Sequence, residues 1–77
     1  MTLDELKAGE SGRILAVDGE GALRCRLLDL GLTPRTRLTL QKVAPLGDPI
    51  EIRVRGYELT LRTDDARLIR VEKEEQA

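Results

Sequence analysis

Few residues of this chain could carry out chemistry. The 77-residue sequence contains no histidine and a single cysteine, Cys25, so it offers no imidazole base and no histidine-rich metal site. Adjacent carboxylates, Asp64 and Asp65, could bind a divalent cation, but we interpret them as first-turn acids of a short helix. Cys25 lacks partner ligands and is interpreted as an inert thiol, buried or half-buried. We therefore predict no enzyme activity, no cofactor and no metal site.

The most constrained segment is residues 44–50, which reads APLGDPI. Its two prolines fix φ near −65° and restrict the residues that precede them. Gly47 tolerates a positive φ, and Asp48 can close an Asx turn on nearby amides. These features predict a stiff loop with Leu46 at its tip, built to hold an apolar side chain in place.

Alternating apolar and polar residues predict five short strands around this loop. The first strand is apolar on both faces, which predicts burial on both sides. In the second strand the alternation slips near Gln41, which predicts a β-bulge. The predicted strands are Gly12–Val17, Arg37–Val43, the two arms of a hairpin around Gly56-Tyr57, and Leu68–Val71.

The apolar and charged residues of the hairpin predict its register. If Gly56-Tyr57 is a two-residue type II′ turn, apolar pairs fall on one face of the ladder and opposite charges on the other. A slip of one residue would destroy both patterns. The predicted pairs are Val54 with Leu59, Ile52 with Leu61, Arg55 with Glu58 and Glu51 with Arg62.

One helix is predicted at Ala22–Leu30, where apolar residues recur at helical spacing. Leu23, Leu27 and Leu30 form its core-facing stripe, and Gly31 ends it. The other elements are short: a capped turn opened by Thr2 and Glu5, a helical turn at Thr63–Ala66 capped by Thr63 or Asp64, and a frayed tail at 72–77.

Together these elements describe a mainly β fold, a small SH3-like barrel of about five strands with one short helix between the first two. We expect a single domain over residues 1–77. The net charge is −1, and an excess of basic residues between 21 and 62 is interpreted as a solvated outer sheet face. Without a signal peptide, a membrane-length apolar run or a cysteine pair, we expect a cytoplasmic protein that does not insert into membranes.

Some apolar residues lie away from the predicted core. Leu28 is off the helical stripe, and Leu32 continues that side past the helix end. One interpretation is that Leu46 and its loop cover this face within the same chain. The other is a partner groove rimmed by arginines. The candidate partner-binding residues are Arg24, Leu28, Leu32, Arg35, Pro45 and Leu46.

Three motifs, LRCRLLDLGLTP at 23–34, APLGDPI at 44–50 and VRGYELTLR at 54–62, together closely resemble the FeoA family of bacterial ferrous iron transport. The resemblance covers nearly the whole chain. It implies an SH3-like barrel that acts on FeoB, a membrane Fe²⁺ transporter with a cytosolic GTP-binding domain. In one departure, Arg35 follows Pro34 where the family often has glycine, so this turn must avoid a positive φ or accept strain.

The leading hypothesis is a non-enzymatic accessory protein that docks on the cytosolic part of a FeoB-like transporter. The same fold forms the C-terminal domain of some metal-dependent repressors, and a related regulatory domain is one alternative. A chain that begins with Met and lacks a DNA-binding domain favours the stand-alone form. A nucleic-acid-binding barrel is disfavoured because only Tyr57 could stack on a base, and a ferrous-ion carrier because histidine is absent. Weak self-association stays open.

Overall fold

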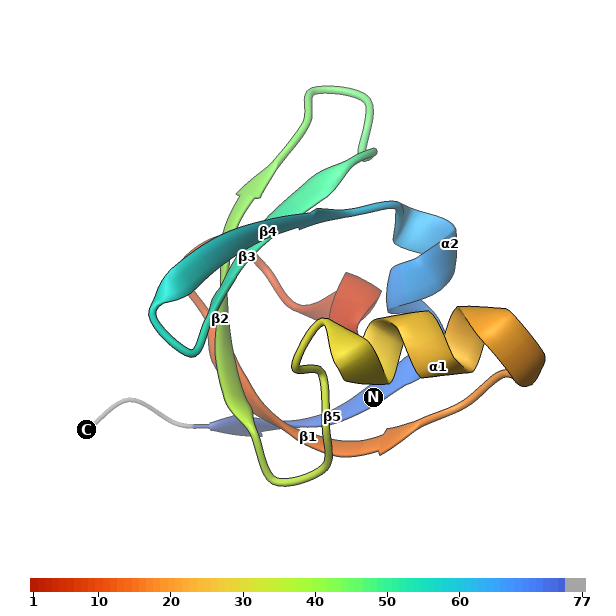
Figure 1. Cartoon of the computed structure of the whole chain (residues 1–77). Helices are drawn as coiled ribbons and strands as arrows, with labels where there is room; N and C mark the ends of the chain where they lie inside the picture. Colours follow the sequence, from red (N-terminus) through yellow and green to blue (C-terminus); the bar gives the residue numbers. More distant parts are fainter. Residues whose placement is uncertain (75–77) are drawn as a thin grey trace.

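The alternating segments fold into five antiparallel strands of one sheet, in the order β4-β3-β2-β1-β5 (Figure 1). The structure is a computed structural model that describes residues 1–74. The predicted mainly β barrel, with one helix between its first two strands, is confirmed. The elements are η1, a 3-10 turn (Leu3–Glu5), β1 (Ser11–Val17), α1 (Gly21–Asp29), β2 (Arg37–Val43), β3 (Ile50–Val54), β4 (Tyr57–Leu61), α2 (Thr63–Ala66) and β5 (Ile69–Glu74).

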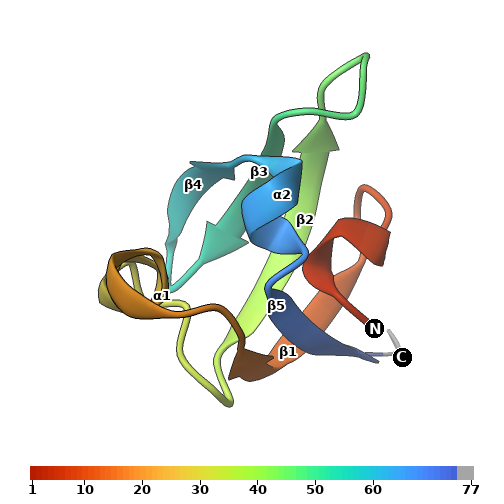
Figure 2. The ribbon, with the colours of Figure 1, turned by 90° about the vertical axis from the view of Figure 1, so that its right-hand side faces the viewer.

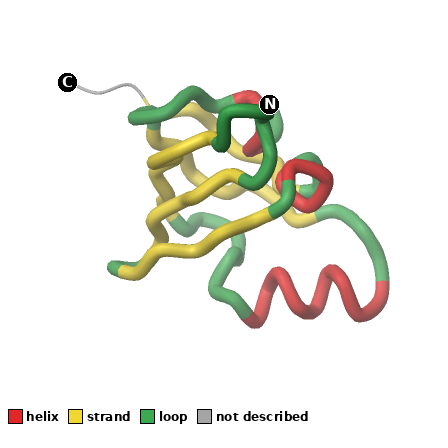
Figure 3. The backbone as a smooth tube through the Cα atoms, turned by 90° about the horizontal axis from the view of Figure 1, so that it is seen from above, coloured by secondary structure: helices red, strands yellow, loops and turns green. Residues whose placement is uncertain are grey.

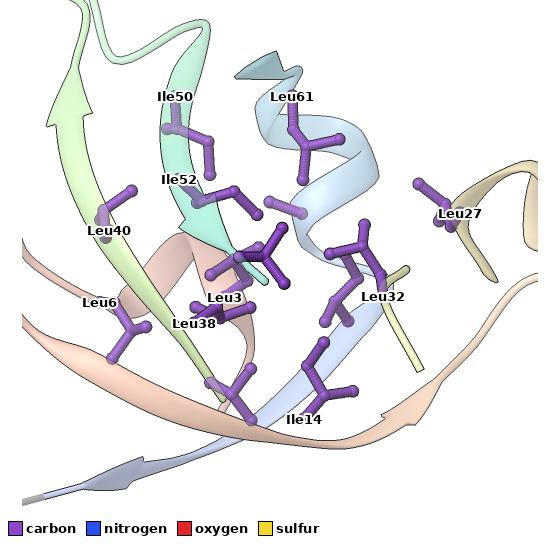
Figure 4. Packing of buried hydrophobic residues seen from close by; sticks show 14 of the residues in the cluster. Leu3, Leu6, Ile14, Leu27, Leu32, Leu38, Leu40, Ile50, Ile52 and Leu61 are labelled. Carbon is purple, nitrogen blue, oxygen red and sulfur yellow. The ribbon is translucent and has the colours of Figure 1, made fainter. Parts of the chain in front are cut away.

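Aliphatic side chains fill the inside of the curled sheet, since the chain has no phenylalanine or tryptophan. β4 and β5 form the two edges of the sheet, and α2 lies in the opening between them (Figure 2). Leu27 reaches in from α1 to join the core (Figure 4). The fully buried large aliphatic residues are Leu3, Ile14, Leu27, Leu32, Leu38, Leu40, Ile52, Val54, Ile69 and Val71.

β1 contains a bulge that was not predicted from the sequence. Its pairing with β5 shifts between Ile14 and Ala16, which leaves Leu15 as the extra residue. Leu15 is 52% exposed, whereas Ile14 and Val17 are buried. The prediction that β1 is buried on both sides was therefore wrong. The extra residue shifts the in–out alternation by one position. Apolar residues before and after it can therefore face the same side of the sheet, although their sequence spacing suggests opposite sides.

β2 has the predicted bounds and the predicted bulge. Its pairing with β3 shifts between Leu40 and Lys42, so Gln41 is the extra residue. The shift leaves Leu40 buried, while Val43 is 43% exposed at the end of the strand. The bulge thus places Val43 on the same face of the sheet as Leu40, opposite the buried Ile50, and Val43 is exposed there because it ends the strand at the base of the loop that follows β2.

The β3–β4 hairpin is closed by Arg55-Gly56 and not by Gly56-Tyr57. Arg55 has φ 51° and Gly56 has φ 83°, as a type I′ turn requires at both central positions. Val54 therefore faces Tyr57, and each residue of β3 pairs two positions earlier in β4 than predicted. Neither predicted charge pair forms across this ladder, since Arg53 faces Glu58 and Glu51 faces Thr60. A shift of two preserves both faces of a strand, so the residue pattern could not distinguish the two registers.

The ends of the described chain are tied together. Glu5 accepts a hydrogen bond from the Thr2 N–H at 2.7 Å, which confirms the predicted cap of the first turn. Residues 72–74, predicted as part of a frayed tail, continue β5 instead. The Lys73 ammonium lies 2.5 Å from a Glu10 carboxylate oxygen and holds this strand against the start of β1. The rest of the predicted tail, 75–77, lies outside the described residues.

Candidate partner-binding site

The loop between β2 and β3 projects away from the barrel (light green, top of Figure 1). Two backbone bonds close it: the Ala44 N–H donates to the Pro49 carbonyl at 3.0 Å, and the Gly47 N–H donates to the Ala44 carbonyl at 2.7 Å. Gly47 has the predicted positive φ, and the Asp48–Pro49 peptide bond is cis. Leu46 stands at the tip and is 96% exposed. The predicted loop with Leu46 at its tip is confirmed, and this side chain covers none of the described residues.

Asp48 fixes this loop to α2 instead of closing an Asx turn. Its Oδ1 atom accepts the Thr63 N–H at 2.8 Å, and the Thr63 hydroxyl donates to the Gly47 carbonyl at 2.7 Å. The N-cap position of α2 is Arg62, which makes no side-chain cap bond, so neither residue predicted to cap this helix does so. A carboxylate from the loop therefore accepts the hydrogen bond of an amide at the start of α2, where no side chain of the helix itself provides a cap.

An apolar hollow of about 320 Å³ lies at the base of the loop. Val43, at the end of β2, contributes an exposed side chain to it. Lys42 and Glu51 place opposite charges beside the apolar lining. The apolar lining residues are Val43, Ala44, Pro45, Pro49 and Ile50. We call Leu46 and this lining the loop site.

The predicted partner groove is not assembled as one surface. Pro45 and Leu46 lie on the projecting loop, whereas α1, which carries Arg24 and Leu28, lies well below it (Figure 1). Leu32 is fully buried, so it cannot line a groove at the surface. The grouping of Leu28, Leu32 and Leu46 was wrong, since of these three residues only Leu46 is exposed.

Leu32 is buried because α1 ends in a Schellman motif. Gly31 has φ 96°, its N–H donates to the Leu28 carbonyl at 3.0 Å, and the Leu32 N–H donates to the Leu27 carbonyl at 3.2 Å. This motif brings the residue after the glycine against the last inward residue of the helix. A helical wheel cannot be continued past Gly31, because the chain reverses there.

The remaining candidates on the α1 side have structural contacts. The Arg24 Nε atom donates to the Val17 carbonyl at 3.0 Å, and Leu28 is half-buried against the core. Arg35 is exposed with φ 74°, so its turn accepts the backbone strain that glycine would avoid. Cys25 is exposed, which corrects the prediction of a buried or half-buried thiol.

The tip of the β3–β4 hairpin holds the end of α1 against the barrel. The Tyr57 hydroxyl donates to the Leu30 carbonyl, and the Arg55 Nε atom donates to the Gly31 carbonyl at 3.3 Å. We call Arg55 and Tyr57 the hairpin clamp. This clamp was not predicted, because the predicted turn placed Tyr57 within the turn and Arg55 opposite Glu58.

The two candidate cation ligands are engaged in ion pairs. Asp64 and Asp65 occupy the first turn of α2 as expected, where Asp64 pairs with Arg67 at 3.2 Å and Asp65 pairs with Arg26 at 3.3 Å. Within residues 1–74, no three His, Cys, Asp or Glu side chains are grouped so that they could hold a metal ion. In the same range, no helix is long and apolar enough to cross a membrane.

Known proteins share this sequence and fold. A FeoA domain model matches residues 1–73. A fusion of Fe(2+) transport protein A with the Fe(2+) transporter FeoB, from Porphyromonas gingivalis, is 39% identical over 72 residues that cover 94% of this chain but only 8% of the fusion protein. The FeoA protein of Chlorobium tepidum is 45% identical, with a TM-score of 0.88 over 95% of this chain and 70% of that one. FeoA of Stenotrophomonas maltophilia, a prokaryotic SH3 domain protein solved with zinc, is 26% identical, with a TM-score of 0.84 over 100% and 99% of the two chains.

Proposed function

Since this chain belongs to the FeoA family of ferrous iron transport, we propose that it is a non-enzymatic accessory protein that docks on the cytosolic part of a FeoB-like transporter. The observation that carries this proposal is Leu46, which is 96% exposed at the tip of a loop closed by its own backbone bonds. The family's SH3-like barrel, predicted from the sequence, provides the rigid support for that loop.

The loop site has the make-up of a docking anchor. Fully burying a leucine side chain contributes about 1.5–3 kcal/mol, and Leu46, which is 96% exposed, gains almost none of this from contacts within residues 1–74. Val43 and Pro45 extend the apolar surface beside it. Energetic anchors of interfaces are surrounded by contacts that exclude water, and the lining of the hollow can provide such contacts around Leu46.

The fusion relative supports the transporter as the partner. In the Porphyromonas gingivalis protein, the segment similar to this chain belongs to the same polypeptide as the FeoB transporter. A covalent link holds two modules at a high local concentration, which favours an association between them. We propose that this chain makes the same association with a FeoB-like transporter.

The test is a binding titration with matched leucine variants. The cytosolic domain of a FeoB-like transporter is titrated with wild-type protein, Leu46→Ala and Leu15→Ala in nucleotide-free, GDP and GTP-analogue states. We expect binding in at least one state, a loss of about 10-fold or more for Leu46→Ala, and little change for Leu15→Ala, whose side chain is exposed on β1. Absence of wild-type binding in every state would overturn the proposal, and equal affinities of the two variants would remove the loop site from it.

A further inference from the structure

A second hollow follows the free edge of the sheet. Within residues 1–74, β4 pairs only with β3, and its other edge faces a hollow of about 650 Å³ between β4, α1 and α2. Figure 3 shows α1 standing apart from the sheet on this side. Leu30 and Leu59 supply apolar lining, and Arg26, Arg62 and Asp65 supply charge. We call this hollow the edge groove.

The backbone of β4 presents unpaired polar groups to the edge groove. Alternate pairs of an antiparallel ladder are hydrogen-bonded, beginning with the pair that closes a two-residue turn. Val54 and Tyr57 are that closing pair, so Glu58 and Thr60 direct their N–H and C=O groups away from β3. These groups are the donors and acceptors that an added strand would use.

We propose that an extended segment of the docked transporter binds in the edge groove as a sixth strand, which rests on the function proposed above. Thr60 lines both the edge groove and the hollow beneath Leu46, so the two surfaces are continuous across β4. A partner anchored at the loop site can therefore extend a segment along β4 without leaving the protein surface.

The charges of the edge groove favour an acidic segment. Arg26 is already paired with Asp65, whereas Arg62 is exposed and makes no ion pair within the described residues. The groove thus has one uncompensated positive charge beside its apolar lining. An extended segment with an apolar residue near Leu59 and an acidic residue near Arg62 matches this arrangement.

The position of α1 favours a single peptide strand over a second copy of this chain. An added strand needs a spacing of only about 4.8 Å from β4, which a peptide in the groove can take. Edge-to-edge pairing of two barrels would bring a second α1 into the same space, because α1 lines the groove on both copies.

The decisive variant is Thr60→Pro, with Thr60→Val as its control. Proline is tolerated in an edge strand where its missing N–H faces outward, so the β3–β4 hairpin should persist, while the bond to an added strand is lost. Thr60→Val keeps the N–H and the strand propensity. In titrations with the transporter's cytosolic domain, we expect Thr60→Pro to weaken binding about 10-fold and Thr60→Val to change it much less. Equal binding by wild type and Thr60→Pro would overturn the strand proposal alone.

Amide hydrogen exchange of the wild-type complex gives a second readout if Thr60→Pro does not fold. We expect the Glu58 and Thr60 amides to become protected when the transporter domain binds. Binding without that protection would overturn the added strand and leave the docking intact, whereas no binding at all would overturn both proposals. Protection that depends on protein concentration in the absence of the transporter domain would assign the edge to a second copy and overturn the peptide.

Discussion

Replacing Gly31 by alanine should destabilise the protein more than the same change at Gly9. The two glycines have nearly the same backbone conformation, with φ 96° and 90°, where an L-residue costs about 1–2 kcal/mol. Their surroundings differ. A Cβ at Gly9 meets no atom within 4 Å, whereas a Cβ at Gly31 lies 3.2 Å from the Tyr57 hydroxyl and 3.3 Å from the Arg55 Cδ. Gly9→Ala therefore measures the backbone cost alone.

The added methyl at Gly31 requires the hairpin clamp to shift by a few tenths of an ångström, which weakens its hydrogen bonds. Tyr57 and Arg55 donate to the carbonyls of Leu30 and Gly31, and each such bond contributes about 0.5–1.5 kcal/mol net. We expect Gly9→Ala to lower the free energy of unfolding by about 1–2 kcal/mol and Gly31→Ala to lower it by about 2–4 kcal/mol. Urea denaturation of both variants measures the difference.

A double-mutant cycle tests the cause. Tyr57→Phe removes the atom nearest to the added Cβ. In the wild type it should cost about 1 kcal/mol, because the bond to the Leu30 carbonyl is lost. In the Gly31→Ala background it should cost close to nothing, because that bond is already weakened and the contact is relieved. Equal losses at Gly9 and Gly31, or strictly additive effects of the two changes, would refute the clamp.

Leu32→Ala should lower the free energy of unfolding by about 2–5 kcal/mol, because Leu32 is fully buried. Leu15→Ala should lower it by less than about 1 kcal/mol, because Leu15 is exposed. Similar losses for the two variants in urea denaturation would contradict the bulge and the Schellman motif. The hydrogen bond from Lys73 and the N–H of Lys7 lower the pKa of Glu10 from its ordinary 4.5. Ionised Glu10 therefore stabilises the fold above that ordinary value, and the contribution disappears as pH falls through the folded-state pKa. Glu10→Gln should flatten this part of the stability–pH curve, and an unchanged curve would contradict the pairing.

Features that depend on neighbouring residues were predictable from the sequence. β2 and its bulge follow from one interrupted alternation, and α1 follows from leucines at helical spacing with Gly31 at the end. The loop follows from its prolines and Gly47, which act on their own backbone and need no distant partner. Leu46 was placed at the tip for the same local reason, and the structure leaves it exposed.

Features that depend on the phase of a pattern or on distant contacts were not predictable. Two hairpin registers that differ by two residues put the same side chains on the same faces, and only the turn at Arg55 distinguishes them. Leu32 was assigned to the wrong side because a helical wheel ignores the reversal at Gly31. The bond from Asp48 to Thr63 and the edge groove join segments that no local rule relates.

Exposure alone does not make Leu46 an anchor. If the loop were mobile, the entropy cost of ordering it on binding would offset the free energy gained by burying the leucine. Fixing the backbone of one residue costs about 1–2 kcal/mol, so ordering even two loop residues would offset the roughly 1.5–3 kcal/mol from burying a leucine. In this loop the bonds of Ala44 and Gly47, and those that join Asp48 to Thr63, are made before any partner arrives. In the proposed complex, the constraint on the loop is therefore what lets the burial of an exposed leucine contribute to affinity.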